Sequence, residues 1–315
     1  MLRFVIRRLL SLIPQLLLAS LAVFGLTSLM PGDAAIAKAG GETASPELVA
    51  QLRAQLGLDQ PLPVRFVHFL GQIATGNLGD SFTSSEPVID VLARRLPPTI
   101  SLVLIGFVIA LLIALPLGIL AALRPNGVID RISLAIATSG VAIPNFWLAI
   151  VLVLVFSLTL KILPATGYIP LTENPLQWLL HMVLPAFTLG VALSAELTRQ
   201  LRAALSEQLR RDYVRTMRAA GLREWSVVLR HALRSALGPA VTTLALQVPV
   251  AIGAAVVIEA VFNLPGIGSQ MVSAVFSRDI PVLQGLILFT VVIVVLGNFL
   301  ADLAYAFINP KVRLS

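Results

Sequence analysis

Long uninterrupted apolar stretches are the feature that most limits how this chain can fold. A helix needs roughly 20 apolar residues to cross about 30 Å of hydrocarbon. The six stretches that reach this length are Leu9–Met30, Thr99–Ala122, Ile132–Leu160, Leu179–Thr198, Leu237–Ala260 and Val282–Ile308. Because the chain is also 57% hydrophobic and only 12% charged, these stretches predict membrane-spanning helices rather than the core of a soluble domain.

We therefore expect an all-α integral membrane protein with six transmembrane helices. Helices suit this role because they bond every backbone group within the segment itself. Interior prolines at Pro116, Pro185 and Pro249 are compatible with spans if neighbouring helices satisfy the freed carbonyls. The third stretch exceeds the minimum length, and Pro144 is the natural site for a kink in it.

Basic residues are unevenly distributed between the segments that connect these stretches. If the N-terminus is cytoplasmic, 16 of the 23 Lys and Arg residues lie in inner segments. Nine of these are arginines between Arg199 and Arg234. Since short cytoplasmic loops carry the excess of positive charge, this distribution predicts that both termini lie inside.

The predicted topology divides the chain into three parts. Residues 1–30 form an N-terminal transmembrane anchor helix, residues 31–98 an extended external region with short helices, and residues 99–315 a five-helix core that includes the cytoplasmic loop 199–236. In the external region Ser45 is an expected N-cap before Pro46, and Gly57 an expected helix stop. We interpret this region as a small external cap rather than a dedicated binding domain.

A short amphipathic helix is predicted within the cytoplasmic loop. At about 100° per residue, Arg211, Arg215 and Arg218 share one side, whereas Tyr213 and Met217 lie nearly opposite. A helix this short is marginal alone in water, so we expect a protein partner or the rest of the chain to hold it.

The ends of this helix carry capping signals. Asp212 is an expected N-cap, and Gly221 fits the left-handed residue after a helix, with Leu222 packing back onto Met217. The next segment repeats the amphipathic pattern, with Arg223 and Arg230 on one side. We expect that segment to lie along the inner membrane surface, where its arginines either contact anionic headgroups or support docking.

Several motifs resemble those of permeases of ABC importers for oligopeptides, dipeptides or nickel. They are Asp212–Leu222 with Arg230–Leu233, His181–Pro185, Ile143–Phe146, Glu259–Gly268 and Leu56–Pro61. The external family motif Gly-Asp-Leu-Gly-x-Ser is similar to Gly76–Ser81, in which the acid stands at Asp80. The resemblance covers nearly the whole chain.

The resemblance implies a permease subunit in the bacterial cytoplasmic membrane, working with several partners. These are a homologous second permease in a heterodimer, two ABC ATPase subunits that bind ATP and Mg²⁺, and an extracytoplasmic substrate-binding protein; no nucleic acid and no cofactor in this chain are implied. The residues implied to couple the chain to an ATPase are Asp212, Tyr213, Arg215, Met217, Arg218, Gly221 and Leu222. Tyr213 and Met217 would be the buried anchors.

Polar residues inside the apolar stretches are candidates for the translocation path, because such groups are costly in lipid. They are Asn145, Gln247, Glu259, Asn298 and Asp302. The alternative for the three amides is an interhelical hydrogen bond. For Glu259 we favour a structural role, in which it bonds the backbone amides of the following turn.

Other function classes find less support in the sequence. None of the three lysines follows a glycine, so there is no phosphate-binding loop and we do not expect the chain to hydrolyse ATP. The three histidines are dispersed, which disfavours an enzyme of the membrane interior. Peptides are the preferred substrate class; nickel or another small solute, and less favourably a self-sufficient secondary transporter, are the alternatives.

Overall fold

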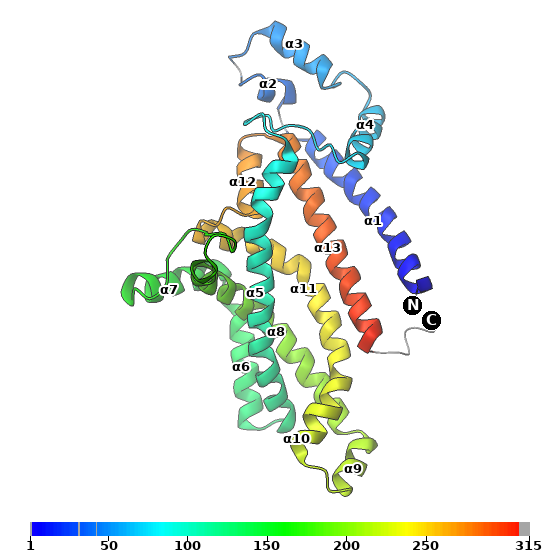
Figure 1. The fold of residues 1–315 in the computed structure, drawn as a ribbon, viewed down its shortest axis with the longest axis vertical. Helices are drawn as coiled ribbons and strands as arrows, with labels where there is room; N and C mark the ends of the chain where they lie inside the picture. Colours follow the sequence, from blue (N-terminus) through cyan, green and yellow to red (C-terminus); the bar gives the residue numbers. More distant parts are fainter. Residues whose placement is uncertain (1, 31, 42, 309–315) are drawn as a thin grey trace. The chain divides into compact units, whose positions relative to one another are not determined.

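The computed structural model describes residues 2–30, 32–41 and 43–308, and within these ranges the chain is helical (Figure 1). The only β-type pairing in the described part is an isolated antiparallel bridge between Asp80 and Pro87. This confirms the predicted all-α class. The elements are α1 (Leu2–Ser28), α2 (Ala34–Lys38), α3 (Pro46–Gln55), α4 (Leu62–Ala74), α5 (Val88–Leu123), α6 (Val128–Ala142), α7 (Asn145–Leu152), the π-helix η1 (Val153–Thr159), α8 (Pro175–Leu209), α9 (Asp212–Ala219), α10 (Glu224–Ser226), the π-helix η2 (Val227–Ala232), α11 (Leu233–Phe262), α12 (Ile267–Phe276) and α13 (Ile280–Ile308).

Five of the predicted apolar stretches lie in long, uninterrupted helical segments. These candidate spans are Leu10–Ser28, Val88–Leu123, Pro175–Leu209, Glu224–Phe262 and Ile280–Leu300. The helices continue through Pro116, Pro185 and Pro249. Interior prolines are therefore tolerated as predicted.

The third predicted span is broken rather than kinked. α6 and the α7–η1 segment meet at 96°, so a sixth span exists only if this bent pair is counted as one. Ile143 adopts φ −83° and ψ 121°, the extended conformation favoured before a proline, and Pro144 has no amide hydrogen with which to continue the helix. The expected change of direction at Pro144 is confirmed in position, but it is a break between two helices and not a kink within one.

The segment after α9 also differs from the prediction. α10, η2 and α11 follow one another without a break, so Glu224–Phe262 is one helical segment. Val228 and Ala232 are fully buried in an apolar cluster with Leu205 of α8 and Ala122 of α5. Because this packing uses the apolar side of the segment, the expectation of a separate helix along the membrane surface is wrong.

The chain forms two compact units. Unit 1 contains residues 98–264 and 296–308, and unit 2 contains residues 2–97 and 265–295. Residues 265–295 thus group with the N-terminal part, whereas the sequence-based division placed them in the five-helix core. Both α5 and α13 contribute to the two units.

Unit 1 is built around α8, which packs against α11 and α6. Its main core contains Leu102, Leu189, Leu193, Ile258 and Phe262, all at most 1% exposed. Gly190 of α8 and Gly106 of α5 let these two helices approach closely, because a Cβ at either position would clash with the other helix. This unit carries all of the predicted site residues.

Unit 2 contains α1 to α4, the N-terminal part of α5, α12 and the N-terminal half of α13. Ser45 caps α3 by accepting a hydrogen bond from the Leu48 amide, and Gly57 follows the helix with φ +63°, so both predicted signals are confirmed. Arg53 pairs with Asp33 at the start of α2. Although burial raises the pKa of Asp33, the hydrogen bond from Arg53 and those from backbone amides lower it overall.

Candidate coupling interface and translocation path

The α9 helix begins one residue earlier than its sequence suggested. Arg211 is the N-cap, with an extended backbone, and makes no side-chain cap bond. Asp212 is therefore the first helical residue, and the prediction that it caps α9 is wrong. Its exposed carboxylate instead lies 3.5 Å from the Arg215 guanidinium, one turn along.

The end of α9 has the predicted geometry. Gly221 adopts φ +79°, which is left-handed backbone that glycine adopts at no steric cost. The Leu222 amide donates to the Met217 carbonyl at 3.2 Å, and the Gly221 amide donates to the Arg218 carbonyl at 3.0 Å. These two bonds form a Schellman motif, so Gly221 fixes where the chain leaves the helix.

Replacing Gly221 with alanine tests this role. No atom lies within 4 Å of a Cβ at this position, so the cost is confined to the backbone. We expect Gly221→Ala to destabilise the α9 end by about 1 kcal/mol. Gly221→Asn should cost less, because asparagine tolerates the left-handed region better. Limited proteolysis of the α9–α10 connection measures the effect, and equal cleavage of wild type and Gly221→Ala would refute it.

α9 is fixed to its own chain by contacts that the sequence only partly revealed. Val214 is fully buried. The Tyr213 hydroxyl donates to the Gln208 amide oxygen at 3.1 Å, so this predicted partner anchor is half-buried against α8. Met217 is half-buried as well. The sequence missed Val214 because valine lies between the two faces of the predicted helix.

An ion pair closes the connection between α9 and α10. Arg218 donates to Glu224 through Nε at 3.0 Å and through Nη2 at 2.5 Å. The hydrogen bond to Glu224 raises the pKa of Arg218. Arg218 thus braces the turn that Gly221 begins, instead of being a free charge.

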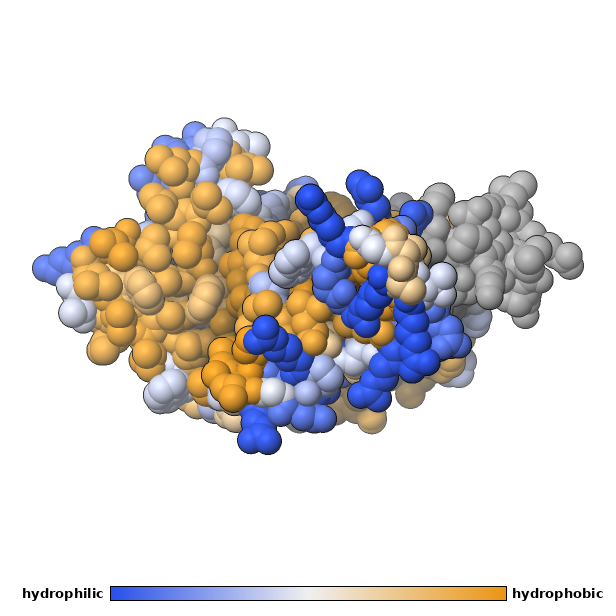
Figure 2. Space-filling view, turned by 90° about the horizontal axis from the view of Figure 1, so that it is seen from below, coloured by the Kyte–Doolittle hydropathy of each residue, from blue (hydrophilic) through white to orange (hydrophobic). Residues whose placement is uncertain are grey.

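The surface left open around α9 is strongly basic. Figure 2 views the molecule from the α9 end and shows hydrophilic side chains gathered there beside a broad hydrophobic surface. Exposed arginines of this part are Arg210, Arg211, Arg215, Arg218, Arg223, Arg230 and Arg234. Such a surface suits a partner that carries acidic side chains.

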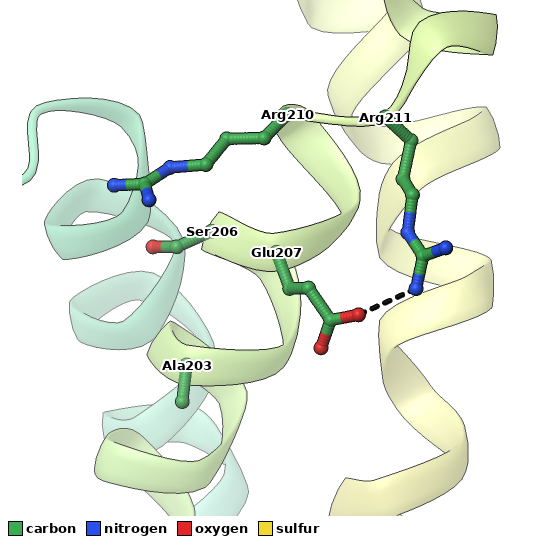
Figure 3. Close-up of a pocket in the computed structure, with 5 residues that line it drawn as sticks. All are labelled: Ala203, Ser206, Glu207, Arg210 and Arg211. Carbon is green, nitrogen blue, oxygen red and sulfur yellow. Dashed lines mark hydrogen bonds and ion pairs between the residues drawn. The ribbon is translucent and has the colours of Figure 1, made fainter.

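The last turn of α8 borders a shallow cavity of about 380 Å³ (Figure 3). Ser206 and Arg210 point to one side of the helix, and Glu207 turns to the other side to accept a 2.5 Å hydrogen bond from Arg211. Glu207 is therefore engaged, and Arg210 adds its charge to the basic surface.

Among the predicted path residues, Gln247 has a packing role. Its side chain is 8% exposed and donates from Nε2 to the Leu193 carbonyl at 3.0 Å, which joins α11 to α8. The interhelical alternative is the one observed. Asn145 at the start of α7 and Asn298 in α13 are half-buried; the Asp302 side chain lies outside the described part of the chain.

Glu259 is fully buried near the C-terminal end of α11. It accepts a 2.5 Å hydrogen bond from the Thr99 hydroxyl of α5. Its carbonyl accepts from the amides of Asn263 and Leu264, where the helix ends with Asn263 at φ +50°. The Thr99 bond gives the side chain a structural role between α11 and α5, and its full burial closes it to a substrate. Bonds from the turn's amides to the carboxylate itself stay a prediction.

Two buried acidic groups were missed. Asp130 of α6, 2% exposed, accepts two hydrogen bonds from Arg202 of α8 and one from the Asn126 amide. In unit 2, Asp279 accepts from the Ser81 hydroxyl and the Phe82 amide, which explains the serine of the motif at 76–81. These pairs are far apart in sequence, and no local spacing reveals them.

Comparison with known proteins decides the family. Residues 114–314 match the family described as binding-protein-dependent transport system inner membrane component, and residues 1–103 match the N-terminal part of such membrane components. The chain belongs to this family. It is accordingly a multi-pass inner-membrane permease subunit of an ABC transport system, as the sequence motifs predicted.

Full-length relatives share about two fifths of their residues with this permease. A protein of Brucella abortus named as a peptide transport system permease is 40% identical over 309 residues, covering 98% of both chains. A glutathione transport system permease protein of Pectobacterium atrosepticum is 42% identical over 313 residues, covering 99% of both chains.

A solved structure supports the fold. An inward-facing conformation of the MetNI methionine ABC transporter matches with a TM-score of 0.59 and 20% identity, over 71% of this permease and 99% of that chain. At this identity the likeness concerns the fold alone. It agrees with a helical ABC permease core extended by additional segments.

Proposed function

We propose that this permease forms half of a translocation pathway for peptides and that α9 couples it to an ATPase. The observation that carries the proposal is the exposed basic surface of α9, held on α8 and α10 by Val214, Tyr213 and Arg218. A helix braced in this way transmits displacement instead of absorbing it. Arg215, 77% exposed, remains available to a partner.

The proposed assembly is the one that membership of the family implies. Its partners would be a second, homologous permease, two ATPase subunits with bound ATP and Mg²⁺, and an extracytoplasmic binding protein. No glycine-rich phosphate loop occurs in the sequence, so hydrolysis is assigned to the partners. Closure of the ATPase pair would shift α9, and with it α8, between inward-open and outward-open arrangements.

Rigidity at the α9 end supports this mechanism. Asp130 and Arg202 join α6 to α8, and the buried cluster of Leu205, Val228 and Ala236 joins α8 to η2 and α11. A movement imposed on α9 would therefore move several helices as one body. Tyr213 and Met217 act mainly within the chain in this proposal, and the exposed arginines provide the docking surface.

Peptides are the proposed substrate class because the relatives named for peptide or glutathione transport match over the full chain. Glutathione is itself a tripeptide. Nickel and other small solutes are the alternative class.

Uptake measurements test the proposal. The complex that co-purifies with the tagged permease would be reconstituted into vesicles with its binding protein and supplied with ATP and a labelled tripeptide. We expect uptake that requires ATP and is competed by unlabelled di- and tripeptides. Competition by nickel but not by peptides would reject the substrate class, and uptake without ATP would reject the coupled mechanism.

A further inference from the structure

Unit 2 contains a cavity of about 540 Å³ that the transport mechanism does not use. Its lining includes Phe24 of α1, Lys38 of α2, Arg65 and His68 of α4, and Gln284 of α13. The volume is within the range of small-molecule sites. All its lining residues belong to this unit.

The cavity holds two cations that are positioned by aromatic rings. Lys38 Nζ lies 5.7 Å from the centre of the Phe82 ring, and Arg65 Cζ lies 5.9 Å from that of Phe24. Within the described ranges, no carboxylate forms an ion pair with either side chain. A cation on a ring face keeps N–H donors available for another ligand.

The remaining lining groups add little negative charge to the cavity. Asp80 is the only acid among the lining residues described, and His68, Gln72 and Asn77 add polar groups. Gln284 is already engaged, donating to the Thr27 hydroxyl at 2.6 Å. Two cations against one carboxylate favour a negatively charged ligand with several acceptor oxygens.

The position of the cavity indicates where that ligand comes from. It lies at the end of α1, beside Phe24 and Thr27, and at the start of α13, where two candidate spans end. The ends of spans lie at the level of lipid headgroups. On the same face of α1, one and two turns before Phe24, the exposed side chains of Leu21 and Leu17 suit acyl chains.

We propose that this cavity binds the phosphate group of an anionic phospholipid, with Lys38 and Arg65 as its principal ligands and the Leu17–Leu21 face of α1 contacting the acyl chains. A free phosphate ion would use the same cations but would gain nothing from α1. This binding site is additional to the transport function and does not depend on it.

Binding of short-chain phosphatidylglycerol to the full-length permease in an uncharged detergent tests the site. Each basic residue near an anionic headgroup contributes about a fivefold factor, so Lys38→Gln/Arg65→Gln should weaken binding by about 25-fold. Lys38→Arg/Arg65→Lys should bind within about threefold of wild type, because the charges remain. Arg94→Gln/Arg95→Gln removes two charges from the same unit outside the cavity lining, and should leave binding unchanged.

Three results would overturn the proposal. Equal affinity of Lys38→Gln/Arg65→Gln and wild type would exclude the cavity as the site. Inorganic phosphate that competes as well as the lipid would assign the site to free phosphate. Displacement of the lipid by a dipeptide at lower concentration would identify a peptide site instead.

Discussion

Asp130→Ala is expected to destabilise the permease by about 3 kcal/mol, because it leaves the partly buried Arg202 guanidinium without its partner. Asp130 is 2% exposed, whereas 25% of the Arg202 side chain is reached by solvent. This access keeps the expected loss at the low end for a buried pair. Thermal unfolding of the purified chain in detergent measures it.

Two further variants isolate the buried charge as the cause. Arg199→Ala breaks the exposed Glu196–Arg199 pair, whose side chains are 47% and 49% exposed, and should cost less than about 0.5 kcal/mol. Asp130→Ala/Arg202→Met removes the unpaired charge and should recover part of the loss. If Asp130→Ala were no worse than Arg199→Ala, the pair would not hold α6 to α8.

Gly190→Ala is expected to destabilise unit 1 by about 1–3 kcal/mol through overpacking. A Cβ on Gly190 would lie 2.6 Å from Ile109 Cγ2 and 3.0 Å from the Gly106 carbonyl oxygen. The β-branched Ile109 side chain cannot easily rotate away, and the Gly106 carbonyl is part of the helix backbone, so neither group can easily make room for the new Cβ. α5 and α8 would have to separate.

A second glycine in a helix provides the matched control. Gly253 lies within α11, and no atom is within 4 Å of its Cβ position. Gly253→Ala should therefore be neutral or stabilise the purified chain by about 0.5–1 kcal/mol. Unfolding midpoints that fall equally for both variants would contradict close packing at Gly190.

The fold class and the helix ends were predictable because their causes are local. Run length located the apolar helices, and the capping residues Ser45, Gly57 and Gly221 marked the ends of α3 and α9. The break at Pro144 was located, but its angle depends on packing that the sequence does not display. Asp212 was misjudged by one residue, since Arg211 has the extended backbone of the cap.

The site was less predictable because its contacts join distant parts of the chain. The Asp130–Arg202 and Ser81–Asp279 contacts span 72 and 198 positions, and nothing at either end signals its partner. Gln247 has the same residue type whether it packs helices or lines a path. Only its bond to the Leu193 carbonyl distinguishes the two.

Site-directed crosslinking of α9 tests the central claim most directly. The chain contains no cysteine, so Thr216→Cys provides a unique thiol on the exposed side of α9. Labelled with maleimide–benzophenone in native membranes and irradiated, it should form an adduct with an ATP-binding subunit. Ser84→Cys, exposed in unit 2, should not. Failure of Thr216→Cys to capture an ATPase, or equal capture from both positions, would contradict coupling through α9.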